Sequence, residues 1–552
     1  MNYDVCIIGS GAGAGPLAYE LSHAGKKVVI LEKGDIYSEE DFSKDEIAYT
    51  KRNIFTPKLN DEYHTIETLE DGVWVKTPTY ENNWNFWNGS LLGGSSNFMS
   101  GFFHRLKPND FKLKSVYGAY EGANMEDWPI RYEDLEPYYD MVEKIVGVSG
   151  QVSEHAHQEP RSTNTYPYPP LVEHPIVEKF DAACKELNFT PFMTPRAILS
   201  EPKGNRNPCY YSHYCGSYAC SSGAKGSSRA ALIQPALATG NLHIIANAFV
   251  VKLETDGAQK VKKALYLTKE GTQKQVKAKL FILAAQAVES SRLLLNSKNE
   301  AFPNGLANSS GAVGKNLLFS GGGMGSGEFD VSHFSQEVLL QPGLFVNRAL
   351  KDWYFTSKFK GGLIDFLFEH ANPIRRANAL KWEGDKLIFG QKLQDKIFQT
   401  FTITRVLNFE IFNDWMPNDN CFVSVDEKYK DKYGIPVANI RIGAHPEDVR
   451  VGEFLATKAT QLLQHMGAKN IMYEISPLPS QNLQAGGCRF GDNPKKHVLN
   501  RYCQSHDIPN LFVTDGSFMP TGGSVPYTWT IYANAFRVAE YIKTKFDTLV
   551  TL

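Results

Sequence analysis

Near its start the chain carries a glycine-rich run, Gly9-Ser10-Gly11-Ala12-Gly13-Ala14-Gly15, whose residue types suit the binding of phosphate groups. Gly9 permits a tight turn, Gly11 lets the backbone approach a pyrophosphate, and Ala14 is small enough for a helix to pack closely on a strand. A helix that begins in this run offers free N–H groups to the phosphates. Glu32 follows about twenty residues further on, where an acid accepts hydrogen bonds from an unphosphorylated ribose. This spacing predicts a dinucleotide site for FAD or NAD rather than for NADP.

Three of the eight cysteines fall close together, in the pattern Cys209-x5-Cys215-x4-Cys220. Thiolates grouped in this way bind soft metals or iron–sulfur clusters. His213 is the fourth ligand if the site holds zinc, although Cys-x3-His-x-Cys is not a common zinc spacing. A disulfide in an exported protein and plain loop cysteines are the alternatives.

The elements that must position the glycine-rich run are predicted as strand, helix and strand. Tyr3–Ile8 is a short apolar run typical of a strand buried on both faces, Pro16–His23 is predicted as the helix, and Lys27–Leu31 as the second strand. Near the other end of the chain, Pro509–Val513 predicts a strand that runs into a turn, and Thr528–Ile542 predicts an amphipathic helix.

Two further loops carry residues whose backbone can approach a bound cofactor. The segment Asn88–Asn97 is rich in Gly and Ser and is not expected to form regular structure, and the turn Asp515–Pro520 follows the late strand. Together with the first run, these loops provide the candidate cofactor contacts, which are Gly9, Gly11, Ala12, Ala14, Glu32, Gly94, Ser95, Asn97, Asp515 and Gly516.

Taken in this order, the motifs resemble the glucose–methanol–choline (GMC) family of flavin oxidoreductases. Segments from the middle of the chain resemble the branch that holds the flavin subunits of gluconate 2-dehydrogenase and glucoside 3-dehydrogenase; they are Lys107–Phe111, Asp127–Ile130, Asp134–Tyr139 and Cys220–Ser227. The resemblance implies FAD as the cofactor, with Val250 at its adenine end and Thr528 as a further contact.

The resemblance also implies an α/β fold in which a discontinuous, Rossmann-like FAD-binding domain lies beside an α+β substrate domain built on an antiparallel sheet. The FAD-binding domain is expected to take residues 1–125, 200–320 and 480–552, and the substrate domain residues 126–199 and 321–479. Short β-prone runs, Phe401–Val406 and Cys421–Val425, suit an antiparallel sheet that roofs the flavin.

The expected active-site motifs depart from the family pattern. Family members pass hydride from an alcohol to flavin N5 while a base, usually His, takes the hydroxyl proton, and a second His or Asn follows later in the chain. Here the His position falls on Leu483 and the Asn/His position on Pro526, and neither side chain accepts a proton. A shift of one residue brings in Asn482 or Tyr527, and His104 is the third candidate.

The resulting interpretation is an FAD-dependent oxidoreductase acting on the CH–OH group of a sugar, polyol or other alcohol. The alternative is a flavin-binding homologue with non-standard or no alcohol-oxidising activity. Bacterial FAD glucose dehydrogenases, which are relatives in the family, carry a three-cysteine iron–sulfur segment of similar spacing. By that resemblance Cys209, Cys215 and Cys220 relay electrons outward, which favours a dehydrogenase over an oxidase and implies a small partner subunit and a cytochrome-type acceptor.

Composition excludes some classes of partner. The chain has 552 residues with 58 Lys and Arg against 60 Asp and Glu, a net charge of −2, so a nucleic-acid partner is not expected. No apolar run reaches the roughly 18 residues of a transmembrane helix. No secretory signal is recognised, so the cytoplasm is expected, and export to the periplasm with a signal-bearing partner is the alternative.

Overall fold

The apolar run at the start of the chain lies at the centre of a parallel sheet. β1 (Tyr3–Ile8) pairs with β2 (Val28–Leu31) on one side and with β9 (Gln273–Leu283) on the other, and α1 (Gly15–His23) connects β1 to β2. The side chains of β1 from Val5 onward are at most 3% exposed, as expected for a strand covered on both faces.

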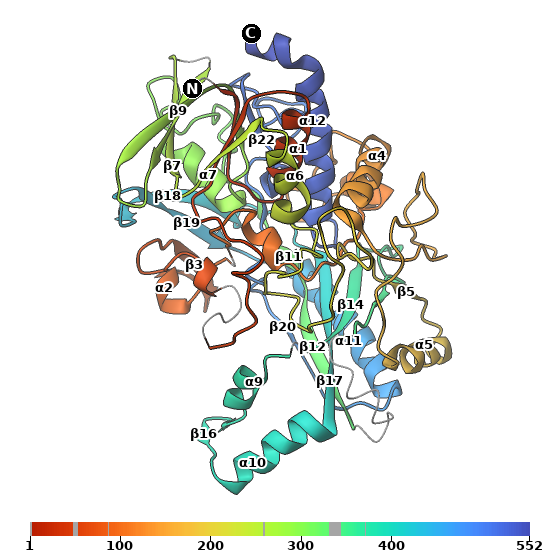
Figure 1. The fold of residues 1–552 in the computed structure, drawn as a ribbon. Helices are drawn as coiled ribbons and strands as arrows, with labels where there is room; N and C mark the ends of the chain where they lie inside the picture. Colours follow the sequence, from red (N-terminus) through yellow and green to blue (C-terminus); the bar gives the residue numbers. More distant parts are fainter. Residues whose placement is uncertain are drawn as a thin grey trace.

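The structure is a computed structural model that describes residues 3–47, 53–86, 88–257, 260–330, 344–369 and 371–551. Within these residues the parallel sheet is completed by strands from distant parts of the chain. β6 (Leu242–Ile245) lies beside β2 and β22 (Leu511–Val513) lies beside β9, so the parallel order is β6-β2-β1-β9-β22. The early and late segments of the sequence therefore form one layer (Figure 1).

Helices and a meander surround this sheet. β7 (Phe249–Thr255) and β8 (Val261–Leu267) continue antiparallel from the first half of β9. The long helix α12 (Thr528–Thr551) packs against α1 and against α4 (Tyr132–Val142), and α7 (Ala287–Asn296) packs against β7.

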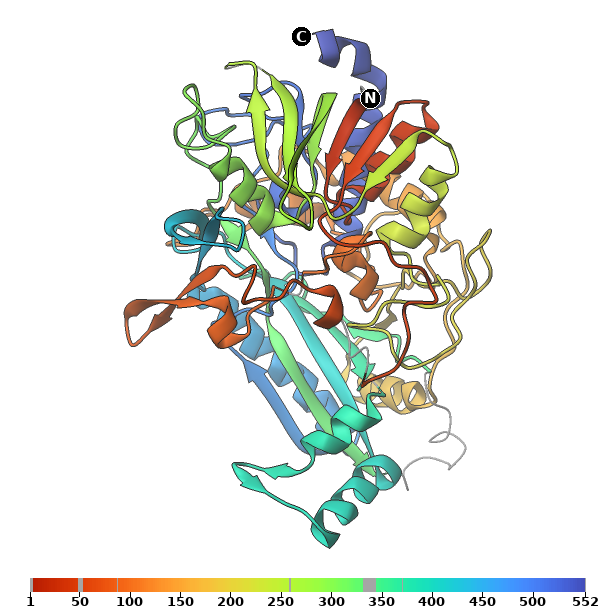
Figure 2. The ribbon, with the colours of Figure 1, turned by 60° about the vertical axis from the view of Figure 1, so that its left-hand side comes forward.

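A second, antiparallel sheet forms the other half of the molecule (Figure 2). Its strand order is β20-β12-β17-β14-β13-β5, and the strands are β20 (Lys469–Ile475), β12 (Gly323–Asp330), β17 (Thr404–Asp414), β14 (Gly362–Phe368), β13 (Arg348–Leu350) and β5 (Pro191–Met193). The helices α11 (Pro446–His465) and α5 (Ile176–Leu187) share a separate apolar core with these strands. The opposite face is left to line a cavity.

Smaller elements join the two halves. A four-stranded sheet has the order β18-β19-β3-β4, from β18 (Phe422–Lys430), β19 (Pro436–Ile442), β3 (Thr65–Glu70) and β4 (Val73–Pro78). The remaining helices and short strands described here are α2 (Thr79–Asn82), α3 (Leu113–Tyr117), α6 (Gln234–Leu237), α9 (Pro373–Ala379), α10 (Gln391–Phe398), β10 (Leu317–Leu318), β11 (Ser320–Gly321), β15 (Trp382–Glu383), β16 (Lys386–Leu387) and β21 (Ala485–Gly486).

The predicted fold class is confirmed, because a parallel Rossmann-like sheet lies beside an antiparallel sheet. Several details of the prediction are wrong. The predicted strand Pro509–Val513 begins at Leu511, and the run Cys421–Val425 contributes to β18 of the four-stranded sheet rather than to the sheet of β17. Residues Gln399–Ile403 form a π-helical turn, so β17 begins at Thr404 and not at Phe401. Helix α12 continues past Ile542 to Thr551 because its apolar stripe extends to Phe546 and Leu549. The domain boundaries themselves stay predictions. Among the described residues, no helix has the length and apolar character needed to cross a bilayer.

Candidate active site

A cavity of about 850 Å³ lies between the two sheets. The parallel strands β1, β2, β9 and β22 all end at this cavity, and residues just beyond their ends line it: Gly9, Glu32, Ala284 and Asp515. The carboxyl ends of parallel strands are the usual place for a ligand in an open α/β sheet. The antiparallel sheet closes the opposite side, with Asn408, Glu410 and Phe412 of β17 among the lining residues.

The glycines of the first turn differ in the space around them: two are packed against other backbone atoms and one faces open space. Gly9 has a φ of +91°, and a Cβ there would lie 2.4 Å from the Ala284 carbonyl oxygen. A Cβ on Gly13 would lie 2.6 Å from the backbone nitrogen of Asp515, whereas a Cβ on Gly11 would meet nothing within 4 Å. Gly11 and its neighbour Ala12 line the cavity. The bare backbone at Gly11 fits a pyrophosphate, and Gly13 is the close packing position that the sequence did not reveal.

This turn is joined to the end of the chain. The Thr514 hydroxyl donates a hydrogen bond of 2.8 Å to the Gly13 carbonyl oxygen, across 501 positions of sequence. Ala14 is fully buried at the start of α1, as the close packing of helix on strand requires.

Glu32 is buried at the cavity wall and holds two loops together. Its carboxylate accepts hydrogen bonds from the Ser10 hydroxyl and, at 2.8 Å, from the Gly34 N–H. Ser10 in turn accepts a 2.8 Å bond from the Gly93 N–H. Burial raises the pKa of Glu32, and the bonds from Ser10 and Gly34 oppose that rise. Glu32 thus lines the cavity just after β2, and its contact with a ribose stays a prediction.

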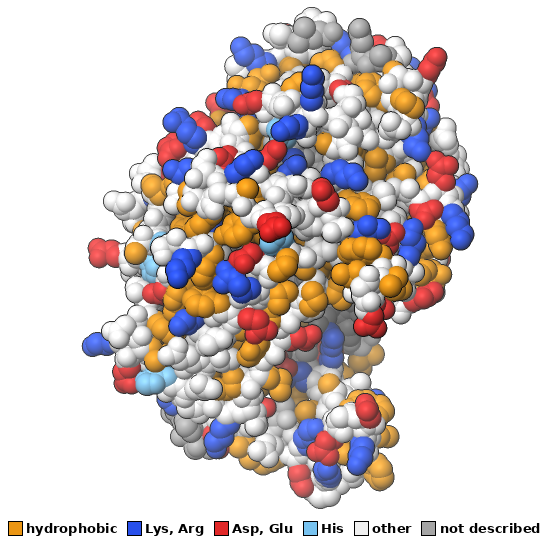
Figure 3. Space-filling model, turned by 180° about the vertical axis from the view of Figure 1, so that it is seen from behind, with side chains coloured by type: hydrophobic (Ala, Val, Ile, Leu, Met, Phe, Trp, Pro, Cys, Tyr) orange, Lys and Arg blue, Asp and Glu red, His pale blue; other side chains and the backbone are white. Residues whose placement is uncertain are grey.

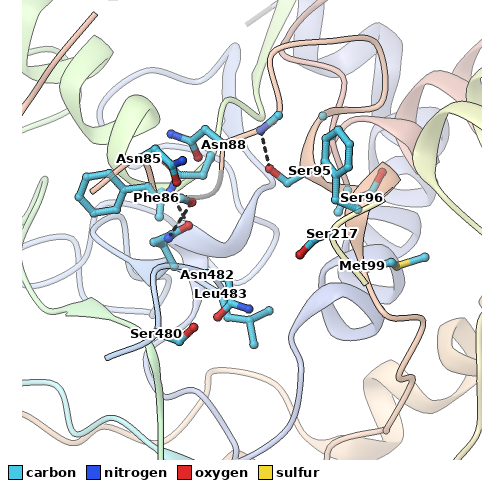
Figure 4. Close-up of a pocket in the computed structure, with 18 of the residues that line it drawn as sticks. Asn85, Phe86, Asn88, Ser95, Ser96, Met99, Ser217, Ser480, Asn482 and Leu483 are labelled. Atoms are coloured by element: carbon cyan, nitrogen blue, oxygen red, sulfur yellow. Dashed lines mark hydrogen bonds between the residues drawn. The ribbon is translucent and has the colours of Figure 1, made fainter. Parts of the chain in front are cut away.

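The second glycine loop packs directly on the first. Gly94 has a φ of +54°, and a Cβ there would lie 3.2 Å from the Gly11 Cα. Ser95 lines the cavity and accepts a 2.9 Å bond from the Gly89 N–H (Figure 4). Asn97 is 2% exposed and does not line the cavity; its amide donates to the carbonyls of Leu92 and Gly94. Asn97 thus stabilises the conformation of the loop through hydrogen bonds to its backbone.

The remaining predicted cofactor residues, Val250, Asp515, Gly516 and Thr528, also line the cavity. The Asp515 carboxylate accepts bonds from the Ser517 N–H at 2.9 Å and from the Ser290 hydroxyl, and burial raises its pKa. Thr528 begins α12, so the positive end of a 24-residue helix points toward the cavity.

The predicted catalytic residues are placed very differently from one another. Asn482 and Leu483 both line the cavity, opposite Met99 and Ser217 in Figure 4, and Leu483 has a left-handed φ of +56°. Tyr527 lies outside the lining, because its buried hydroxyl donates to the Phe319 carbonyl oxygen. His104 is also buried, with Nε2 2.9 Å from the Asp365 carboxylate. Pro526 is buried as well.

Glu410 is a charged residue of the antiparallel sheet, which forms the roof of the cavity, and the sequence did not reveal it. On β17 the alternate residues Asn408, Glu410 and Phe412 line the cavity, and Ile411 contributes to the lining as well. Glu410 pairs in register with Asp365 of β14. Burial raises the pKa of Glu410 to about 7; Asp365 adds to the rise and Arg196 opposes it. The alternation from Asn408 to Phe412 was the available signal, but the strand was predicted to end before it.

A further group lines the cavity near Val250. His64 Nε2 lies 3.1 Å from the Glu289 carboxylate, which also lies 3.3 Å from Arg292. Despite burial, the Arg292 guanidinium and a hydrogen bond to His64 hold the pKa of Glu289 well below its usual value. The three residues come from β3 and α7 regions far apart in sequence, so no local motif predicted them.

The three clustered cysteines are free thiols that line a separate cavity of about 20 Å³ with Lys44 and Lys225. The disulfide alternative is therefore wrong for this structure. Among the described residues no group of three or more His, Cys, Asp or Glu side chains is arranged to hold a metal ion, and His213 does not line this small cavity. Nothing here supports a zinc site, and the iron–sulfur cluster stays a prediction.

Two sequence profiles of the GMC oxidoreductase family match the chain, over residues 66–319 and 417–535. The chain belongs to the GMC oxidoreductase family. This membership makes it a flavoprotein oxidoreductase that takes FAD, and the open face at Gly11 fits the pyrophosphate of that cofactor.

Several curated relatives of this GMC oxidoreductase are similar over nearly their whole length. It is 28% identical to paromamine 6'-oxidase of Streptomyces fradiae, over 98% of this chain and 91% of that protein. It is 27% identical to the fructose dehydrogenase large subunit of Gluconobacter japonicus, over 98% of each chain. It is 25% identical to the gluconate 2-dehydrogenase flavoprotein of Pantoea cypripedii, over 98% of this chain and 94% of that one.

Among solved structures, pyridoxine 4-oxidase from Mesorbium loti superposes with a TM-score of 0.61 at 16% identity, covering 98% of this chain and 99% of that one. At this identity the likeness concerns the fold, and it agrees with the two-sheet architecture described above.

Proposed function

We propose that this GMC oxidoreductase uses FAD to oxidise the CH–OH group of a sugar, polyol or other alcohol. The observation that carries the proposal is the cavity between the two sheets, which joins a bare-backbone phosphate turn at Gly11 to a roof that presents Glu410. The names of relatives that span the whole chain, among them fructose dehydrogenase and gluconate 2-dehydrogenase, support an alcohol or sugar substrate.

An alcohol oxidised in this cavity must lose a hydride from carbon and a proton from oxygen to become a carbonyl compound. FAD, when bound, supplies the hydride acceptor. Glu410 takes the hydroxyl proton, because its carboxyl lines the cavity and a pKa of about 7 suits a base that works near neutral pH. Asn482 lines the same cavity and orients the hydroxyl through its amide.

Anaerobic addition of a panel of sugars, polyols and simple alcohols tests this function. Bleaching of the visible flavin absorbance by at least one of them is expected, since hydride transfer reduces the cofactor. If none of them bleaches the flavin, the proposal fails. The alternative, a flavin-binding homologue without alcohol oxidation, is then favoured, and it is motivated by Leu483 and Pro526 at the positions where the family pattern has proton-accepting side chains.

For the fate of the electrons we favour a dehydrogenase. An iron–sulfur cluster, if held by Cys209, Cys215 and Cys220, would supply one-electron transfer from the flavin to a partner. Cys215 lines the small cavity of the three thiols, and the next two residues, Gly216 and Ser217, line the FAD cavity. The two cavities therefore lie next to each other at this point of the chain. Burial acts to raise the pKa of Cys220, but the Lys225 ammonium and bonds at Ser222 lower it overall, which favours a thiolate. One relative is described as a large subunit, which supports a small partner subunit for this chain. A cytochrome-type acceptor is part of the same proposal.

Iron and acid-labile sulfide assays on anaerobically purified protein test the relay. The expected result is that both are present and that Cys220→Ser lowers both without lowering FAD content. Absence of iron and sulfide removes the relay but leaves flavin reduction by the alcohol untouched. Oxygen consumption during turnover separates an oxidase from the proposed dehydrogenase.

A further inference from the structure

A segment between β14 and β17 projects from the body of the molecule (Figures 1 and 2). This arm, residues 373–403, contains α9, the hairpin of β15 and β16, α10 and the π-helical turn that precedes β17. None of the residues in α9, in α10 or in that turn is buried. Ile388, between β16 and α10, is the one buried residue of the arm, so the arm has almost no core of its own.

The arm gathers large apolar side chains at its surface. Exposed apolar residues on it are Ile374, Trp382, Leu387, Phe389, Phe398 and Phe401. Phe389 is 79% exposed and Phe398 is 61% exposed. In the described part of the chain, every exposed Phe and the one exposed Trp lie on this arm. Such a concentration in one projecting element marks a surface that contacts something apolar.

Charged side chains of both signs lie among these apolar side chains, as Figure 3 shows for one face of the molecule. The arm has six basic residues, which are Arg375, Arg376, Lys381, Lys386, Lys392 and Lys396, and three acidic ones, which are Glu383, Asp385 and Asp395. Its net charge is thus 6 − 3 = +3, whereas the whole chain has a net charge of −2. The arm is opposite in sign to the rest of the molecule.

We propose that the arm docks on the surface of a membrane that contains anionic lipids, with its aromatic side chains inserted at the headgroup level. Trp, Phe and Leu beside Lys and Arg on a short amphipathic element are the combination that binds an anionic interface without spanning it. A second copy of the chain is a poorer occupant, since two arms of charge +3 would repel each other.

The base of the arm gives this docking a consequence for the active site. Arg375, Arg376, Ala379 and Leu380 from the first part of the arm, with Thr400 from its last part, line the FAD cavity. A docked arm would bring the lining at its base close to the lipid surface. This would give a lipid-dissolved substrate or electron acceptor a short path to the cavity. The docking itself does not depend on the proposed alcohol oxidation.

Co-sedimentation of the full-length holoprotein with vesicles tests the docking. One set of vesicles is phosphatidylcholine alone, and the other is phosphatidylcholine mixed with phosphatidylserine. The protein is expected to bind the mixed vesicles and to be released by added salt, because the basic residues provide the attraction. The double variant Phe389→Ser/Phe398→Ser should bind at least about tenfold more weakly. Lys386→Gln should weaken binding to the mixed vesicles about fivefold.

Val73→Ser is the matched control, because Val73 is 64% exposed on the separate hairpin of β3 and β4 and its loss should leave vesicle binding unchanged. Circular dichroism and flavin absorbance check that each variant is folded. The proposal is overturned if the wild-type protein does not bind the mixed vesicles, or if the aromatic variant binds them as well as wild type. A dimer seen by light scattering that the aromatic variant loses would instead assign the arm to a second copy.

Discussion

The nucleotide end of the cavity and its roof end differ in what they offer a ligand. At the nucleotide end, backbone groups of two glycine loops face the cavity, and hydrogen bonds of the Ser10, Asn97 and Thr514 side chains hold those loops in place. At the roof end the antiparallel sheet presents side chains, and Glu410 is the charged one on β17. A backbone site tolerates little change in residue type, because any side chain fills the space of the ligand. A side-chain site can change its chemistry while the strands stay the same.

The largest effect on FAD content and activity is expected from Gly11→Val, in the first glycine loop at the nucleotide end. The new side chain enters the open cavity and displaces the pyrophosphate, so FAD and all activity should be lost while the apoprotein stays folded. Visible absorbance gives the FAD content and circular dichroism gives the fold. Gly13→Val is the contrasting variant, since its Cβ meets backbone atoms at 2.6 Å and the protein itself should be destabilised. Full FAD content in Gly11→Val would mean that the cofactor lies elsewhere.

The second largest effect on activity is expected from Glu410→Gln at the roof end. Loss of the proton acceptor should lower kcat/KM by roughly 10²- to 10⁴-fold while FAD content is unchanged. Glu369→Gln is the matched control: Glu369 also lines the cavity but is paired with Arg376 at 3.0 Å, and its replacement should have a small effect. If kcat/KM falls equally in the two variants, Glu410 is not the proton acceptor.

A third effect concerns pH. The pKa of Glu410 is raised to about 7, so its carboxyl is protonated below that value and cannot accept a proton. The value of kcat/KM should therefore fall by about tenfold per pH unit below 7 and level off above it. In Glu410→Gln this dependence should disappear. If the acidic fall-off persists unchanged in the variant, another group is the base.

The contrast between the nucleotide end and the roof end also explains which parts of the site could be predicted from the sequence. The residues of the turn from Gly9 to Ala14 are contiguous and their conformation is set locally, so spacing alone located this part of the site. Glu410 gains its position from pairing with Asp365, and its raised pKa from burial and from the charge of Asp365, which Arg196 opposes. Both Asp365 and Arg196 come from distant parts of the chain. Tyr527 and His104 had suitable chemistry, but burial against Phe319 and Asp365 is a tertiary property that no local pattern carries.

The smallest effect is expected from Tyr527→Phe. The hydroxyl donates to the buried Phe319 carbonyl oxygen, and its loss should lower the free energy of unfolding by about 1–3 kcal/mol. Activity of the folded variant should stay within about twofold of wild type, because the hydroxyl does not line the cavity. Denaturant unfolding and steady-state kinetics check the two parts, and a drop of the size expected for Glu410→Gln would make Tyr527 catalytic.

The bond between Thr514 and Gly13 has a consequence for biosynthesis. The bond joins the glycine turn after β1 to the segment that continues through β22 and α12, 501 positions later in the chain. The wall of the FAD cavity therefore stays incomplete until that later segment has been synthesised, because a long-range contact forms only when both of its segments are present. A chain truncated before Thr514 should bind FAD much more weakly than the full chain, which the visible absorbance of the purified proteins checks.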